Sequence, residues 1–116
     1  MKIKINKESV IGGIQIASNI LPQKTGAAFL KMIWLEGSDN NLKIMSTDSK
    51  LEFSGNYSAQ VLEDGIVGVQ GKSFYDLFKR LPPGEIELNV KPEESVLFMK
   101  QGPRKYKLPT FDSTWF

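Results

Sequence analysis

Apolar and polar side chains alternate over residues 1–6, which is the period of two expected of a β-strand with one buried face. After this predicted strand the period changes. Apolar residues recur at steps of four, three and four, at Val10, Ile14, Ala17 and Leu21. This spacing places them on one stripe of an α-helix. Asn6 is the expected N-cap, and Pro22 predicts the end of the helix because a residue before proline disfavours the helical conformation.

The same order recurs in the second half of the chain. Three predicted strands, over residues 29–36, 41–46 and 51–57, follow the first helix. A short strand and a second amphipathic helix come next, and the helix again ends in Leu-Pro. Three more predicted strands, over residues 86–90, 95–100 and 104–108, complete the unit. Five apolar positions in the two units are separated by a constant 64 residues, for example Ile14 and Phe78.

This internal repeat predicts the fold class. Two units of the same order indicate an α+β domain with pseudo-twofold βαβββ-βαβββ topology, in which two antiparallel sheets share a core and the two helices are neighbours. The length of 116 residues has room for a single domain over residues 1–116.

Composition excludes most catalytic chemistry. The chain contains no cysteine and no histidine, which removes thiol nucleophiles, Cys/His zinc sites and histidine-based proton transfer. Most routes to catalysis are therefore closed, and we expect no metal and no cofactor. The net charge of +2 is too small to indicate a nucleic-acid partner by itself. No apolar run is long enough for a membrane span, so we expect a cytoplasmic protein without a membrane partner.

One short segment resembles a nucleotide-binding loop. Gly71-Lys72-Ser73 lies between a predicted strand and a predicted helix, as in the phosphate-binding loop of nucleotide hydrolases. That loop requires a glycine five positions before Gly71, where this chain has Ile66. The alternative is that Gly71 and Ser73 begin the helix and that Lys72 lies on its solvated side.

Basic residues gather near the predicted helices. Lys72, Lys79 and Arg80 lie on the outer face of the second helix, where Asp76 is the one acidic residue, and Lys24 follows the first helix. If the helices are neighbours, these positions share a surface that can contact phosphates without recognising bases. A plain solvated face is the alternative interpretation.

The last predicted strand is strongly basic. Lys100, Arg104, Lys105 and Lys107 have no acidic residue among them, while Tyr106 and Leu108 point to the other face. Lysines commonly protect an edge strand against unwanted pairing. The functional alternative is an edge that pairs with a partner strand.

Taken together, these segments resemble a known family, the N-terminal domain of the beta subunit of bacterial DNA polymerase III, which is the replicative sliding clamp. The resemblance covers nearly the whole chain. It rests on the opening Met-Lys-Ile-Lys-Ile strand, Ser46-Thr47-Asp48, Phe74-Tyr75-Asp76, Leu81-Pro82, Gly102 and Lys105-Tyr106-Lys107-Leu108.

The resemblance implies a DNA-binding processivity factor and not an enzyme. Such clamps are similar to one another in being homodimeric rings of three-domain subunits that tether the replicative polymerase to double-stranded DNA after a clamp loader has placed them there. It implies a location at the nucleoid. It also implies that this chain corresponds to the first of the three domains, so that a clamp subunit would continue past Phe116.

Residue roles follow from the resemblance at matching positions. Lys24, Lys72 and Lys79 match basic DNA-contacting positions, and Arg80 falls where the family varies. The predicted subunit interface comprises Arg104, Lys105, Tyr106 and Leu108. Two alternatives of other classes stay open at this point, a small nucleotide-binding enzyme that uses Gly71-Lys72-Ser73 and a stand-alone protein-interaction module.

Overall fold

The computed structural model describes residues 1–22 and 31–111. In these ranges the chain forms nine strands, two α-helices and one short 3-10 helix. Their bounds are β1 (Lys2–Asn6), α1 (Lys7–Asn19), β2 (Met32–Ser38), β3 (Asn41–Thr47), β4 (Glu52–Ser58), β5 (Gln60–Glu63), β6 (Gly65–Gln70), α2 (Gly71–Arg80), β7 (Glu85–Lys91), the 3-10 helix (Pro92–Glu94), β8 (Val96–Gln101) and β9 (Arg104–Phe111). Neither helix is long and apolar enough to cross a membrane.

The strand order explains why the two halves need each other. The strands are arranged as β4-β3-β2-β6-β9-β8-β7-β1-β5, and every pair of neighbouring strands in this order is antiparallel. The first strand of each half pairs with the other half, β1 with β7 and β6 with β2. This exchange is symmetric between the halves, as expected for a repeated unit. The α+β class is confirmed.

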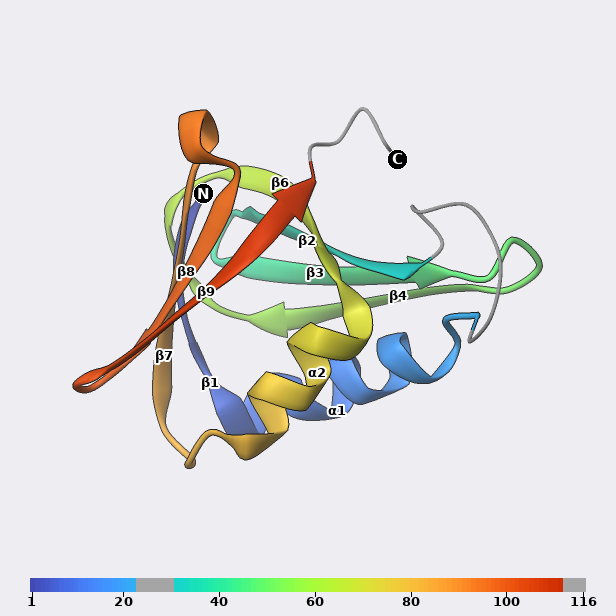
Figure 1. Cartoon of the computed structure of the whole chain (residues 1–116), viewed down its shortest axis with the longest axis horizontal. Helices are drawn as coiled ribbons and strands as arrows, with labels where there is room; N and C mark the ends of the chain where they lie inside the picture. Colours follow the sequence, from blue (N-terminus) through green and yellow to red (C-terminus); the bar gives the residue numbers. More distant parts are fainter. Residues whose placement is uncertain (23–30, 112–116) are drawn as a thin grey trace.

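One predicted feature is wrong, because the two sheets are joined. β9 pairs with β8 as far as Pro109, and its last residues, Thr110 and Phe111, pair with β6. The predicted strand ends at Leu108, and the residue that follows is a proline, which has no N–H to donate within a central strand. Pro109 lies where pairing passes from β8 to β6, so its missing donor is tolerated there. Figure 1 shows the resulting two groups of strands at an angle, with both helices between them.

A further strand, β5, was not predicted. It covers four residues and pairs with β1 at the far edge of the sheet, with Val61 opposite Ile3. Only Val61 of the four is partly buried. Four residues with one apolar position give no usable alternation, and the sequence after Val61 resembles a polar turn.

The core lies between the helices and the sheet. The apolar positions that predicted both helices, among them Val10, Ile14, Phe74 and Phe78, are fully buried. The rings of Phe74 and Phe78 lie 5.5 Å apart in a tilted arrangement, a geometry that favours aromatic pairs. Both helices therefore form in the predicted places, because burial of one apolar stripe stabilises each of them.

Helix ends differ from the prediction in their capping. Asn6 is the N-cap of α1, but its side chain makes no capping hydrogen bond. In α2 the N-cap is Gln70, whose Oε1 accepts a hydrogen bond from the Ser73 amide at 3.0 Å. The end of α1 is fixed from the sheet, because the buried Ser46 hydroxyl donates to the Ala17 carbonyl at 2.8 Å.

Candidate nucleic-acid interface

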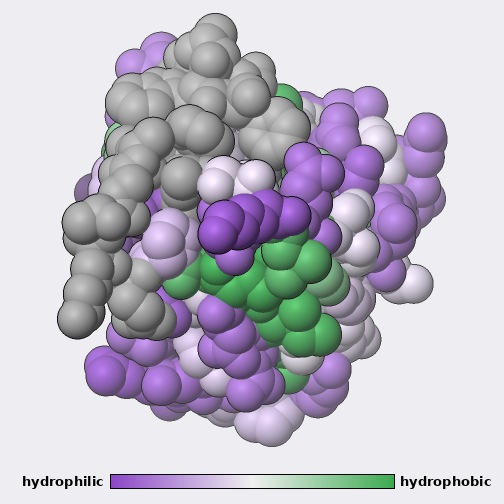
Figure 2. Space-filling view, turned by 90° about the vertical axis from the view of Figure 1, so that its right-hand side faces the viewer, coloured by the Kyte–Doolittle hydropathy of each residue, from purple (hydrophilic) through white to green (hydrophobic). Residues whose placement is uncertain are grey.

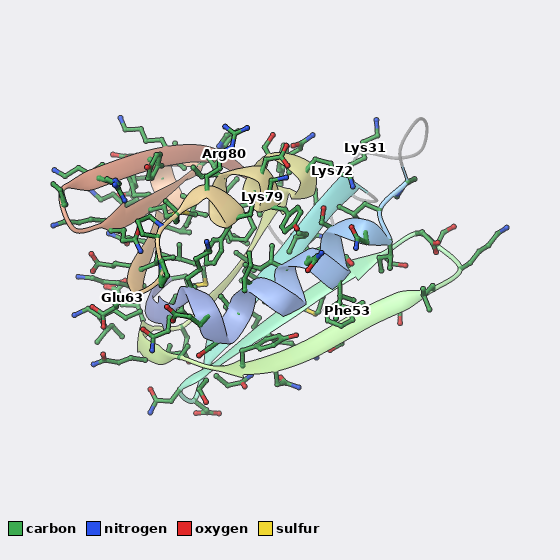
Figure 3. The ribbon with its side chains drawn as sticks, turned by 90° about the horizontal axis from the view of Figure 1, so that it is seen from below. Lys31, Phe53, Glu63, Lys72, Lys79 and Arg80 are labelled. Carbon is green, nitrogen blue, oxygen red and sulfur yellow. The ribbon has the colours of Figure 1, made fainter. Side chains whose placement is uncertain are left out.

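The surface of α2 carries the predicted DNA-contacting residues that the structure describes. Lys72 and Lys79 are seven residues apart, so they lie on the same face about two turns apart along the axis. Lys79 and Arg80 are exposed, whereas Lys72 is half-buried. Arg80 follows Lys79 by one residue and is turned about 100° around the helix. Figure 3 shows these three side chains along α2. Lys24 lies outside the described residues.

Lys72 is predicted to lie on the solvated side of α2, but its side chain instead links α2 to α1. Its Nζ donates to the Ser18 carbonyl at 3.3 Å, in the last turn of α1. Lys7, the first residue of α1, donates in the opposite direction to the Lys79 carbonyl at 3.0 Å and to the Leu81 carbonyl. Each helix therefore has a lysine in its first turn that donates to backbone carbonyls at the end of the other helix. A cation there also meets the negative end of the helix dipole.

The Lys79 side chain is about half exposed to solvent, although it has one acidic neighbour. Its Nζ lies 3.5 Å from Asp76, and the two side chains are 49% and 56% exposed. An ion pair this exposed is weak and screened by salt. The Lys79 ammonium also lies 5.2 Å from the centre of the Tyr75 ring, one turn earlier in α2, and this cation–π contact helps to hold it at the helix surface.

Lys31 is a further cation at this surface. It precedes β2, and together with Lys72 it lines a hollow of about 130 Å³. Leu21, Pro22 and Gln70 complete the lining. Figure 3 shows Lys31 near Lys72, at the start of α2. Sequence reasoning missed Lys31 because it precedes an apolar run on a different element, and only the fold brings it beside Lys72.

The segment that resembles a phosphate-binding loop starts a helix instead. β6 ends at Gln70 and α2 begins at Gly71, so no loop remains to surround a phosphate. A Cβ on Gly71 would lie 2.2 Å from Leu21 Cδ1, which shows that glycine is needed for close packing. The Ser73 amide is bound by Gln70 and the Lys72 ammonium by Ser18. Over residues 1–22 and 31–111, no group of three or more acidic residues could hold a metal ion.

β9 presents a partly free edge. Arg104 to Pro109 pair with β8 on one side, and β6 contacts the other side only at Thr110 and Phe111. Among the described strands, none pairs with the remaining part of that side. Arg104, Lys105 and Lys107 are exposed, whereas Tyr106 and Leu108 are half-buried against the core, as the alternation predicts.

Apolar side chains also reach the surface. The large exposed ones among the described residues are Ile16 at 50%, Leu51 at 55% and Leu62 at 46%. Figure 2 shows an apolar area surrounded by hydrophilic residues on the side of the molecule that carries the β3–β4 turn. Areas of this kind are typical of surfaces that contact other proteins or domains.

Comparison with known proteins gives a consistent result. A family model described as DNA polymerase III beta subunit, N-terminal domain, matches residues 1–116. The beta sliding clamp of Helicobacter pylori is 27% identical over 117 residues, which covers 100% of this chain and 31% of that protein. The beta sliding clamp of Proteus mirabilis is 26% identical, with 100% and 32% covered.

Solved structures agree on the fold. The DNA polymerase sliding clamp from Caulobacter crescentus superposes with a TM-score of 0.93 at 20% identity, over 100% of this chain and 32% of that one. The Helicobacter pylori beta clamp bound to a DNA ligase peptide gives 0.90 at 26% identity, over 98% and 32%. The chain thus spans about a third of the length of the relatives it matches.

Proposed function

The chain belongs to the DNA polymerase III beta subunit family, as its N-terminal domain, and from this premise we propose that it forms one DNA-facing segment of a ring-shaped sliding clamp. Proteins of this family are not enzymes. The complete ring would be a homodimer of three-domain subunits, of which residues 1–116 would be the first. It would tether the replicative polymerase to duplex DNA at the nucleoid in the cytoplasm, after placement by a clamp loader.

The arrangement of α1 and α2 carries this proposal. Both helices lie on the same side of the sheet (Figure 1). Lys72 and Lys79 lie along one face of α2, where Lys79 is exposed and Lys72 is half-buried. Cations spaced along a helix can contact successive phosphates but cannot recognise bases, so binding would be independent of sequence. Lys31 and Arg80 would add contacts at the ends of the same surface. We also expect a phosphate contact from Lys24, which lies outside the described residues.

The free edge of β9 supports a role in ring closure. An unpaired strand segment can add a strand from another chain, and Arg104, Lys105, Tyr106 and Leu108 form this segment. We propose that it pairs with a strand of the second subunit. Reversing two charges, with Arg104→Glu and Lys105→Glu in the complete subunit, is expected to convert dimers into monomers in sedimentation velocity. Unchanged dimers would contradict this role.

DNA binding by the 116-residue chain should be weak, because one segment of a ring cannot encircle DNA. We expect a dissociation constant of roughly 10⁻⁴ to 10⁻⁶ M for labelled duplexes at physiological salt, the same for different sequences. Lys72→Gln combined with Lys79→Gln should lower the salt slope by about 1.8, since each phosphate contact contributes about 0.9. Fluorescence anisotropy across a salt series measures both quantities.

Two matched variants sharpen this experiment. Asp76→Asn should strengthen duplex binding, because it removes the carboxylate that lies beside Lys79. Lys43→Gln removes the same charge from β3, on the sheet face that points away from the core, and should leave the salt slope near the wild-type value. Nanomolar or sequence-selective binding, or equal slopes for all variants, would refute the assigned surface.

A further inference from the structure

The sheet face opposite the helices carries a second basic surface. In β8, Leu97 and Met99 are buried in the core, so Phe98 and Lys100 point to the other face. On β9, Lys107 is opposite Phe98 and Lys105 is opposite Lys100. Lys91, at the end of β7, joins them. We call this set, Lys91, Phe98, Lys100, Lys105 and Lys107, the outer lysine face.

Its centre is an aromatic ring held between ammonium groups. Lys91 Nζ lies 5.4 Å and Lys107 Nζ 5.6 Å from the centre of the Phe98 ring. The ring is half-buried in a hollow of about 380 Å³, whose lining includes Asn89 and Tyr106 besides the outer lysine face. A hollow of this size can admit a flat group beside the ring, because flexible lysines move aside easily.

The positive charge of this face is not neutralised. Glu87 is the carboxylate that lines the hollow, and its Oε1 lies 3.8 Å from Lys2 on β1. The four lysines of the outer lysine face make no ion pair with any described residue. Four cations around one apolar ring therefore favour a ligand with several negative charges and a flat apolar part.

We propose that the outer lysine face binds single-stranded nucleic acid. Its phosphates would pair with the lysines, and one base would stack on Phe98 in place of a lysine. Lysine-rich grooves with exposed aromatic rings are the usual construction of surfaces that bind single strands without sequence preference. A duplex offers no free base face to Phe98, because its bases are stacked on each other.

Composition argues against a protein ligand on the same face. The centres of protein–protein interfaces are enriched in aromatic residues, methionine and arginine and depleted of lysine, and this face has four lysines around its one phenylalanine. The site is also separate from the α2 surface, since Leu97 and Met99 lie between Phe98 and the helices. Its occupation does not depend on whether α2 contacts duplex DNA.

Titration of the 116-residue chain with labelled oligo-dT tests this proposal. Phe98→Leu is expected to weaken oligo-dT binding about tenfold, within the range measured for loss of one stacked base, and to leave duplex binding unchanged. Phe98→Tyr keeps the ring and should keep the affinity. Lys105→Gln with Lys107→Gln should lower the single-strand salt slope by about 1.4, at about 0.7 for each contact.

Controls separate the possible results. Lys43→Gln removes a lysine from the same side of the sheet but outside the hollow, and should leave oligo-dT binding at the wild-type level. Thermal melting verifies that each variant is folded. Equal oligo-dT affinity of the wild type and Phe98→Leu would overturn the proposal. So would displacement of oligo-dT by polyglutamate at equal charge concentration, which would assign the face to an acidic peptide.

Discussion

The two helices occupy equivalent places in the two halves, but different side chains fill the space between each helix and the sheet. α2 fills the space beneath it with the rings of Phe74 and Phe78. α1 instead approaches β4 closely through Gly13, where a Cβ would lie 2.1 Å from the Tyr57 hydroxyl. In one half the helix supplies the aromatic ring, and in the other half the sheet supplies it.

Their outer faces differ as well. The exposed positions of α1 include Glu8, Gly12, Gln15 and Asn19. The one cation of α1, Lys7, is half-buried and donates to carbonyls at the end of α2. α2 exposes Lys79 and Arg80 and half-exposes Lys72. The comparison teaches that a repeated backbone geometry does not repeat its surface chemistry. We therefore expect phosphate contacts on the α2 side of the helix layer.

The largest expected change in stability comes from removing the buried Phe78 ring of α2. Phe78→Ala should lower the free energy of unfolding by about 3–5 kcal/mol, because it removes a fully buried ring and leaves a cavity. At the matched position on α1, Ile14→Ala removes a smaller side chain and should cost less, within about 2–5 kcal/mol. Urea denaturation measures both changes. Equal losses would show that the two helices are anchored alike after all.

The close approach of α1 to β4 gives the next largest effect. Gly13→Ala should destabilise by about 1–2 kcal/mol, since overpacking against the Tyr57 ring exceeds the gain in helix propensity. Its neighbour Gly12 has no atom within 4 Å of a Cβ position, so Gly12→Ala should stabilise by about 0.5–1 kcal/mol. In a Tyr57→Ala background the penalty at Gly13 should disappear, and its persistence there would contradict the steric explanation.

The two lysines that cross between the helices differ in their number of acceptors. Lys7 donates to two carbonyls and Lys72 to one. Lys7→Met should therefore cost about 1–2 kcal/mol and Lys72→Met about 0.5–1 kcal/mol, from the lost hydrogen bonds and the lost helix-end charge. Thermal melting at low salt compares them. A larger loss at Lys72 would reverse the ranking and imply a stronger contact there.

The smallest effect concerns the β3–β4 turn. The Asp48 carboxylate accepts hydrogen bonds from the amides of Leu51 at 2.7 Å and Lys50 at 2.9 Å, and these bonds lower its pKa below the usual value. Because the folded pKa is lower than the unfolded pKa, this stabilisation is complete above the unfolded value. It is lost as pH falls through the folded one.

Asp48→Asn should therefore remove a small acid-dependent part of stability. Melting temperatures of the wild type and Asp48→Asn measured from pH 6 down to pH 2 should converge at the acidic end. Parallel curves over this range would show that the turn does not depend on the charge of Asp48.

Periodicity alone predicted most of the fold in this chain. The alternation in residues 1–6 and the helical stripes around Ile14 and Phe78 report burial directly. These elements could therefore be predicted without knowing any contact between distant parts of the chain. β5 and the extension of β9 past Pro109 depend on partners that are distant in sequence, and no local pattern reports them. The joined sheet was missed for this reason.

The candidate site was less accessible to sequence reasoning. Lys79 and Arg80 could be placed because helix spacing defines their face. The contact of Lys72 with Ser18 and the position of Lys31 beside Lys72 required the distance between two elements. Resemblance to the clamp family supplied roles that physical patterns could not, and the matches to that family confirm the family and fold but leave those roles as predictions.

The exchange of first strands between the halves has a consequence for how the chain acquires its structure. The β1–β7 ladder cannot form until β7 has been synthesised, since Lys2 pairs with Asn89. Contacts this distant in sequence also slow folding. During synthesis the first half would leave the ribosome with β1 lacking this partner. A nascent chain that ends before residue 85 is therefore expected to stay sensitive to protease, whereas the full 116 residues should become resistant in one cooperative step.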